Sequence, residues 1–536
     1  MRAIASALLA AAAILEPSFS FAQTYAPNPP QITTPEHVDS PIGGLDFRDG
    51  IPSAGTAAKL YDYLDLTRGV EAFLNGFSGV SMYAIREGFR DAGVKDNDVL
   101  IFSGLMDSKS LFLTANADTI YFWGYLDLSK GPLVVEVPAE SLGIFDDMWF
   151  RWILDFGAAG PDRGQGGKYL VLPPGYDGPL PEGGYFIARS RTNGVGLIAR
   201  AFLEHNDPAP AVARIKAGLK IYPYVAGSYG SSIGAFLNGA GPLGQLSTPT
   251  TPTFVEGTGR VMNTVPPNDA SYYEMLNALV QEEPAAALDP ELAGQFAAIG
   301  IVKGETFRPS DHARDVLAEA AALGNAASRT IGTRARTAEG FTYYPDSSWS
   351  NPLFAGGYDF MDPPPEITGG SVKRLPSTGA RALDARTSFF YLATVITPAM
   401  VMRLTNIGSQ YLGTFYDAQG NPFDGAKTYK VTLPPNIPAA RFWSFTVYDN
   451  QSRSMLQTAQ RFPRAGSQSF PTPAGAANAD GSTTIYFSPT RPNGVAEGNW
   501  IQTTPGKGWF VLLRLYSPLQ PFFDKTWRPG EIELAQ

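Results

Sequence analysis

Residues 442–527 constrain the fold more than any other part of the chain, because short aromatic and β-branched runs alternate there with turn residues. The stretch begins with the run FWSFTVYD at 442–449, continues with TIYF at 484–487 and ends with WFVLLRLY at 509–516. Each run has the length of one strand, and Pro, Gly, Asn and Asp separate the runs. The pattern predicts a β-sandwich.

Composition sets the broad class of the protein. A chain of 536 residues has room for two to four domains of about 150 residues each. With 44% hydrophobic and 17% charged residues it can bury large cores and is not disordered overall. A net charge of −9 argues against a nucleic-acid partner, which requires a basic surface. The 56 glycines and 45 prolines suit many turns between short strands.

The N-terminus resembles an export signal. Arg2 precedes an apolar run over residues 4–15, and small residues flank Phe21 before Gln23. This order is typical of a secretory signal peptide cleaved near Ala22. The run is too short to span a bilayer, which takes about 20 residues. We therefore expect a periplasmic or secreted protein without stable membrane insertion. The chain has no cysteine, which excludes thiol nucleophiles, redox pairs and cysteine metal sites.

The periodicity along the mature chain predicts four regions. Residues 23–55 are rich in Pro, Thr, Ala and Gly and are expected to be flexible. Residues 56–207 combine a helix to about residue 91 with a first β-sandwich, which contains predicted strands at 119–123 and 133–137. Residues 208–340 are mostly helical, and residues 341–536 form the second β-sandwich.

The helical region has internal boundaries that the sequence predicts. Residues 209–219 read as one helix, and residues 272–299 read as two helices because Pro284 interrupts the pattern. Ser310 or Asp311 is expected to cap a further helix that reaches residue 324.

Several multi-residue motifs resemble known bacterial domains. In the first half these are NADTIY at 116–121 and LDLSKGP at 126–132, which resemble the signature of domain of unknown function 1254. In the second half the motifs resemble its usual partner, domain of unknown function 1214; they are LDART at 383–387, GSQY at 408–411, FWS at 442–444, QSRSM at 451–455, NWIQ at 499–502 and WRPG at 527–530. The resemblance covers roughly residues 55–535.

The resemblance implies a fold but no established reaction. It implies an exported, mainly β protein with intervening helices and two jelly-roll-like β-sandwich domains, a double jelly roll. It also implies a homo-oligomer, with a trimer similar to double-jelly-roll capsid proteins as the suggested form.

Two polar clusters are candidate sites. Strand alternation would place Asn116 and Asp118 on one face and Tyr121 on the other. Asn116 and Asp118 could then act as ligands or an acid/base pair in a cleft, or they could cap a turn. The second cluster consists of Tyr448, Asp449, Arg453 and Arg514. An Arg–carboxylate fork can bind an anion or join two strands, and we favour the structural interpretation for both clusters.

Other motifs give weaker signals. Gly230 to Gly234 matches the nucleophile elbow G-x-S-x-G with Ser232 at its centre, but the βαβ alternation of that fold is missing. The spacing of Asp417 and Asp424 differs from a calcium loop and suits a turn equally well. His205 or His312 could join carboxylates around a divalent metal, although no cofactor is predicted. The tryptophans 443, 500, 509 and 527 are expected in cores or interfaces.

Two functions remain open from the sequence. The first is a hydrolase or ligand-binding protein that acts on an extracytoplasmic small molecule or polymer through one of the polar clusters. The second is a non-enzymatic oligomeric scaffold. Convergence of the polar residues on one closed pocket would favour the first function.

Overall fold

The computed structural model describes residues 28–225, 237–238, 248–336, 341–351, 353, 355–368, 371–377 and 379–535. The chain divides into two compact units, Met1–Leu64 and Asp65–Gln536. Helix α1 (Ala54–Asp91) runs through the boundary between them. Its bounds confirm the predicted first helix.

The first unit contains a small antiparallel sheet. Strands β1 (His37–Ser40), β2 (Gly43–Arg48) and β3 (Ile51–Pro52) pair in that order. His37 Nδ1 lies 2.7 Å from Asp46 Oδ1 across β1 and β2. The expectation of flexibility over 23–55 is therefore wrong for residues 37–52. The strands are too short and too exposed to show the apolar alternation by which strands are recognised.

In the second unit, residues 65–91 of α1 pack against α4 (Ser271–Glu282) and α6 (Asp311–Thr333). The rings of Phe73 and Tyr272 lie 4.2 Å apart, and the Tyr272 hydroxyl donates to the Phe73 carbonyl at 2.8 Å. Gly79 permits close approach, because a Cβ there would lie 2.4 Å from the ring of Trp149. Close packing of this helix therefore depends on a missing side chain.

The helices between the β regions begin near the predicted positions, but α6 ends at Thr333 and not at residue 324 as predicted. Residues 209–219 form α2 (Ala209–Gly218), and the break at Pro284 separates α4 from α5 (Pro290–Ala297). Ser310 Oγ caps α6 by accepting from the Ala313 amide at 3.2 Å. Of the helices that the structure describes, none has the length and apolar composition needed to span a bilayer.

The first β region is a sandwich of two sheets. The larger sheet has the order β14-β4-β6-β12-β8-β9 and the smaller sheet the order β11-β10-β7-β13. Phe145 and Phe156 of the larger sheet pack on Tyr169 of the smaller sheet, with ring centroids 5.7 and 5.9 Å apart. The strands are β4 (Val99–Ile101), β6 (Ile120–Asp127), β7 (Leu133–Val137), β8 (Ser141–Asp147), β9 (Trp152–Gly157), β10 (Gly167–Leu172), β11 (Phe186–Arg189), β12 (Gly194–Ala201), β13 (Lys220–Pro223) and β14 (Phe254–Glu256).

The second β region is also built from two packed sheets, ordered β18-β24-β20-β21 and β23-β22-β19-β25. Phe487 of one sheet lies 5.9 Å from Phe445 and 5.1 Å from Trp509 of the other. The strands are β18 (Ser409–Thr414), β19 (Tyr429–Leu433), β20 (Ala439–Asp449), β21 (Arg464–Gly466), β22 (Thr483–Ser488), β23 (Trp500–Gln502), β24 (Trp509–Pro518) and β25 (Glu533–Leu534).

Short elements complete the second unit. They are the strand pairs β5 (Ser110–Leu111) with β15 (Met262–Asn263) and β16 (Glu366–Thr368) with β17 (Ser371–Lys373), and the helices α7 (Leu383–Leu392), α8 (Pro398–Val401) and α9 (Gln520–Phe523).

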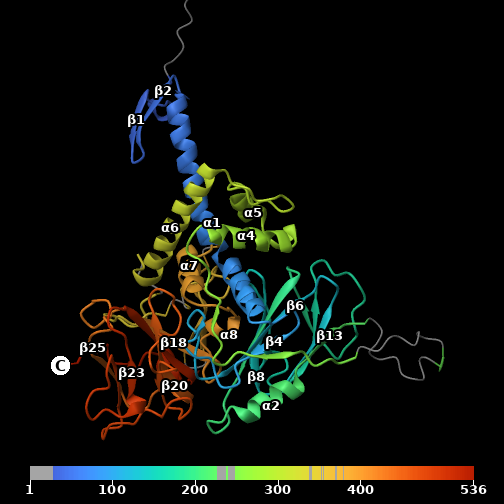
Figure 1. Ribbon diagram of the computed structural model, residues 1–536, viewed down its shortest axis with the longest axis vertical. Helices are drawn as coiled ribbons and strands as arrows, with labels where there is room; N and C mark the ends of the chain where they lie inside the picture. The colour runs from blue at the N-terminus through green and yellow to red at the C-terminus, as the bar shows by residue number, and fades with distance from the viewer. Residues whose placement is uncertain are drawn as a thin grey trace, which may run out of the picture. The chain divides into compact units, whose positions relative to one another are not determined.

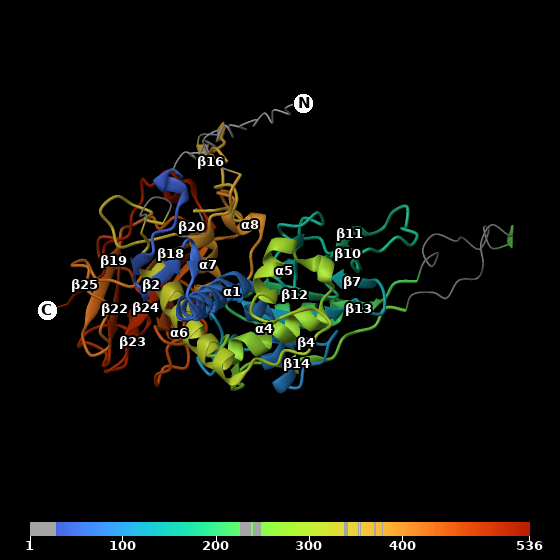
Figure 2. The same ribbon diagram turned by 90° about the horizontal axis from the view of Figure 1, so that it is seen from above.

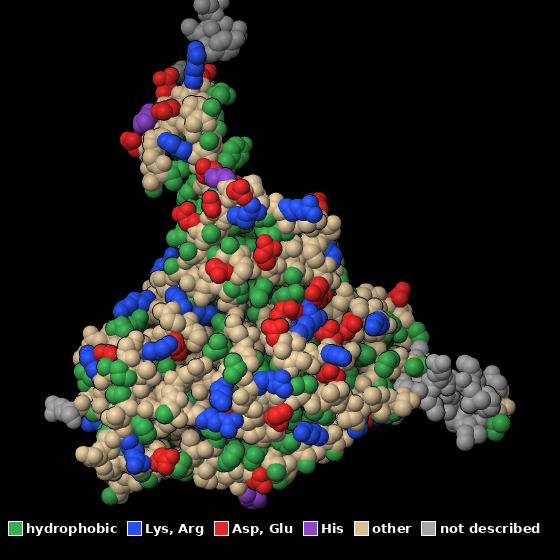
Figure 3. Space-filling model, in the orientation of Figure 1, with side chains coloured by type: hydrophobic (Ala, Val, Ile, Leu, Met, Phe, Trp, Pro, Cys, Tyr) green, Lys and Arg blue, Asp and Glu red, His purple; other side chains and the backbone are tan. Residues whose placement is uncertain are grey.

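Both views of this unit place the two β regions side by side, with α7 and α8 near the junction (Figures 1 and 2). The prediction of a mainly β chain with several sheets and intervening helices is confirmed. Basic and acidic side chains are interspersed over the face seen in Figure 3.

Candidate functional site

A cavity of about 580 Å³ lies where the two β regions meet. Strands β6, β8 and β12 of the first region and β18 and β24 of the second contribute to its wall, and α7 and residues 393–400 cover it. Alternation along each strand decides which side chains face inward, because neighbouring residues point to opposite faces of a sheet. The side chains that line the cavity therefore come from the sheet faces that point away from the two sandwich cores.

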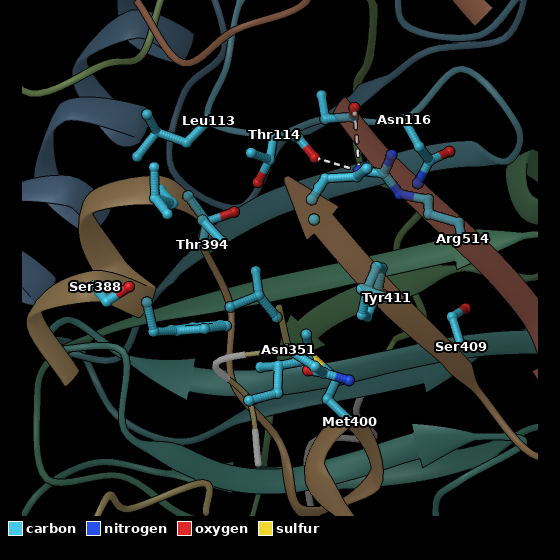
Figure 4. Close-up of a pocket in the computed structure, with 18 of the residues that line it drawn as sticks. Leu113, Thr114, Asn116, Asn351, Ser388, Thr394, Met400, Ser409, Tyr411 and Arg514 are labelled. Atoms are coloured by element: carbon cyan, nitrogen blue, oxygen red, sulfur yellow. Dashed lines mark hydrogen bonds between the residues drawn. The ribbon is translucent and has the colours of Figure 1, made fainter. Parts of the chain in front are cut away.

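Each β region contributes one arginine and one tyrosine to the cavity wall. Arg200 of β12 pairs with Tyr121 of β6, and Arg514 of β24 pairs with Tyr411 of β18. Residues directly opposite on neighbouring antiparallel strands have Cβ atoms about 5 Å apart. Arg514, Tyr411 and the adjacent Ser409 are seen together in Figure 4. Two similar Arg–Tyr pairs therefore line one space.

The two guanidinium groups contact only neutral acceptors among the described residues. Arg200 Nη2 donates to Ser409 Oγ at 3.1 Å, and Arg514 Nη2 donates to the Thr114 carbonyl at 2.6 Å. Neither forms an ion pair within the described part of the chain, and Arg514 Nη1 is buried without a partner there. Arginine keeps its charge even when buried. Burial raises the pKa of Tyr121, although both arginines oppose this shift, so the phenol is neutral at pH 7.

Asp118, the carboxylate predicted for catalysis, forms its contacts at the junction of the two β regions. It is fully buried, and its Oδ1 lies 2.5 Å from Arg464 Nε, whose side chain is also fully buried. Its Oδ2 accepts from Ser444 Oγ at 2.6 Å and from the Tyr516 hydroxyl at 2.9 Å. All three partners belong to the second region, so Asp118 ties the two regions together and is outside the cavity wall.

Asn116 and Tyr121 do line the cavity, but the expected strand geometry is wrong for Asn116 and Asp118. Strand β6 begins only at Ile120. Asn116 Oδ1 accepts from the amides of Asp118 and Thr119 at 2.9 and 3.1 Å, which forms a side-chain-capped turn. Its Nδ2 donates to the Tyr121 hydroxyl at 2.5 Å. Asn116 therefore stabilises the turn and holds the Tyr121 hydroxyl in position.

Of the second predicted cluster, Arg514 lines the cavity, whereas Asp449 and Arg453 lie away from it. Asp449 Oδ2 is 2.6 Å from Lys507 Nζ, and Asp449 Oδ1 accepts from the Gln451 amide at 2.6 Å. Arg453 lies over the Tyr391 ring at 4.0 Å and donates to its hydroxyl at 2.9 Å. Burial lowers the pKa of Arg453 to about 10. Neither Asp449 nor Arg453 lines the cavity.

Two neutral polar side chains of the cavity wall have no hydrogen-bond partner among the described residues. The Asn351 side chain is 1% exposed, and both its Oδ1 and its Nδ2 are unpaired; Ser388 Oγ is unpaired as well. Both residues are part of the cavity wall (Figure 4). A buried amide without partners is destabilising, so its retention points to a ligand group.

One carboxylate also lines the cavity. Asp155 accepts from Thr397 Oγ1 at 2.8 Å and from Trp152 Nε1 at 3.2 Å. Burial raises the pKa of Asp155 to about 6, and these two hydrogen bonds limit the rise. A carboxylate with this pKa can exchange a proton near neutral pH.

Of the other predicted sites, one lies outside the described residues and one forms a turn. Ser232 lies outside the described residues. Asp417 Oδ1 accepts from the amides of Gln419 and Asn421, both at 2.9 Å, as a turn requires. Among the residues that the structure describes, no three His, Asp or Glu side chains come together as a potential metal site.

Comparison with known proteins finds one family match in each half of the chain. The model for Protein of unknown function (DUF1254) matches residues 97–223, and the model for Protein of unknown function (DUF1214) matches residues 408–520. The chain therefore contains both domains in the predicted order. No curated protein matches.

Two solved structures are similar to this chain. The VPA0106 protein from Vibrio parahaemolyticus is 17% identical, covers 88% of this chain and 100% of its own, and has a TM-score of 0.48. A putative uncharacterized protein from Burkholderia cenocepacia is 12% identical, covers 90% of this chain and 97% of its own, and has a TM-score of 0.34.

The sequence reasoning missed Arg200, Asn351 and Asp155. Arg200 had a readable signal: it is the single charged residue in the apolar run GVGLIARA of β12. Arg514 has the same setting in WFVLLRLYSP, where it was noted only as a strand-joining residue. A lone arginine inside an apolar strand is a functional signal, because burying its charge is costly. Asn351 lies in a loop and has no such signal.

Proposed function

We propose that the protein is an exported ligand-binding protein whose cavity takes a small organic anion. The buried excess of positive charge supports this proposal. Arg200 and Arg514 face the same space, and Asp118, whose charge acts on Arg514, is already paired with Arg464. Removing a guanidinium from water costs several kcal/mol, which a bound anion offsets. The cavity volume of about 580 Å³ fits ligands of small-molecule size.

The test compares straight-chain acids from butanoate to decanoate with the corresponding primary alcohols, by calorimetric titration. We expect the acids to bind more tightly. Arg200→Met should weaken acid binding roughly 10- to 100-fold, the usual loss when hydrogen bonds to a charged group disappear. The exposed Arg491 offers a matched control, and Arg491→Met should leave affinity unchanged. Equal binding of acids and alcohols by the natural protein would refute an anion site.

Hydrolysis is the second candidate, and Asp155 is the observation that favours it. With a pKa of about 6, its carboxylate is mostly ionised at pH 7 and could act as a general base inside the cavity. Any turnover should then rise with pH through about 6, and Asp155→Asn should abolish it while acid binding persists. Turnover that survives this substitution would remove Asp155 from the mechanism.

Export, assembly and topology complete the proposal. We propose that the mature chain begins near Gln23 and acts in the periplasm or outside the cell. The two packed-sheet regions are proposed to be jelly rolls, and the protein is proposed to be a homo-oligomer. A non-enzymatic scaffold stays the alternative; it predicts that no member of the acid series binds.

A further inference from the structure

We infer that the ligand carries two functional groups: a carboxylate at one end and a hydroxyl or carbonyl several carbon atoms away, which the Asn351 carboxamide binds. This inference rests on the proposed anion site and names its ligand class as hydroxy- or oxo-carboxylic acids with an apolar body. Three features of the cavity carry it: the unpaired amide, its distance from the arginines and the apolar part of the wall.

Hydrogen bonds fix the main chain at Asn351, whereas its side chain forms none among the described residues. Its backbone N–H donates to the Phe341 carbonyl at 2.8 Å, and the preceding Ser350 exchanges two backbone hydrogen bonds of 2.9 Å with Gly413 of β18. The main chain is therefore fixed at Asn351 and at the residue before it. The carboxamide can donate through Nδ2 and accept through Oδ1, and both atoms are buried and unpaired. A ligand hydroxyl can satisfy both roles with one oxygen.

Strand β18 sets the spacing between the two ends. Tyr411 lies opposite Arg514, whereas Gly413 lies beside Ser350, immediately before Asn351. The Ser350–Gly413 bridge is antiparallel, so Asn351 lies beside Leu412, on the side of β18 away from β24. Neighbouring strands lie about 4.8 Å apart, so two strand spacings, roughly 10 Å, separate the Asn351 position from Arg514 across the sheet. Figure 4 shows Asn351 and Arg514 at separate places around the cavity. A single small group such as acetate cannot reach both.

Part of the cavity wall is apolar. Leu353, Met400 and Leu512 line the cavity and offer no hydrogen bonds. Leu512 pairs with Gly413 and lies two residues from Arg514 on β24, so it continues the wall on the arginine side of β18. Burying methylene groups against such a wall is favourable, which suits a short hydrocarbon chain between two polar ends.

The experiment compares each straight-chain acid, from butanoate to decanoate, with its terminally hydroxylated counterpart by calorimetric titration. At the best chain length we expect the hydroxylated acid to bind about 10-fold more tightly, the effect of one satisfied buried hydrogen bond. Asn351→Leu, which keeps the side-chain size, should cancel or reverse this preference while retaining the binding of the plain acid. Asn351→Ala serves as a second variant if the leucine does not fold, and the exposed Asn493→Leu is the matched control.

A structural role for Asn351 makes a different prediction. An amide that stabilised the fold would lower the melting temperature when replaced, whereas an unpaired amide kept for a ligand should give Asn351→Leu a melting temperature at or above that of the natural protein. Equal binding of plain and hydroxylated acids, or an unchanged preference in both Asn351 variants, overturns this inference but leaves the anion site intact. Acids that bind no better than alcohols overturn both.

Discussion

Asp118→Ala is expected to lower the free energy of unfolding by about 3–5 kcal/mol, because it leaves a buried arginine without its counter-charge. Both side chains of the Asp118–Arg464 pair are fully buried, and the Oδ1–Nε distance is 2.5 Å. The substitution also removes the acceptor of Ser444 and Tyr516. Urea denaturation followed by tryptophan fluorescence measures the loss.

Two further variants separate this pair from other causes of instability. In Asp118→Leu combined with Arg464→Met neither member of the pair is charged, so much of the lost stability should return. Asp177 is exposed, and Asp177→Ala should change stability by less than about 0.5 kcal/mol. A catalytic Asp118 would behave in the opposite way, with activity lost and stability kept. An unchanged denaturation midpoint for Asp118→Ala would contradict the structural role.

The sequence predicted those parts of the fold that have a strong local period. Strands such as residues 133–137 match β7 to the residue, and Pro284 marks the end of one helix because a proline cannot continue the hydrogen-bond ladder. Alternation failed at residues 116–118, because the Asn116 side chain bonds to the backbone and forms a turn there. The alternation of apolar and polar residues does not show when a side chain bonds to the backbone in place of strand pairing.

The site was less predictable, because it depends on which strands come together. Of the seven residues in the two predicted clusters, Asn116, Tyr121 and Arg514 line the cavity. Arg200 and Arg514 share it because the outer faces of two sandwiches meet, which no local periodicity encodes. The ion pair between Asp118 and Arg464 could not be predicted from local sequence either, because Arg464 belongs to a strand of the other domain. A single charged residue in an apolar strand is the one signal that local sequence offers.

Trp509→Ala is expected to cost about 3–5 kcal/mol of unfolding free energy, the range for removing a large buried aromatic side chain. Trp509 is fully buried between the sheets of the second β region. Its ring stacks on Phe423 at 4.1 Å and meets Tyr429 at 5.7 Å. Alanine leaves a cavity that this close-packed interior cannot fill.

The neighbouring residues make this substitution informative about function as well. Alternation on β24 points Trp509 into the sandwich core and Phe510 to the cavity wall. We therefore expect Trp509→Ala to reduce stability without changing the acid affinity of the protein that remains folded. Trp500 is only partly buried, so Trp500→Ala should cost less. Denaturation and calorimetric titration of the same samples test both statements. If Trp509→Ala weakened acid binding as strongly as Arg200→Met does, the two faces of β24 would not act independently, and the cavity would have to be understood as an extension of the sandwich core.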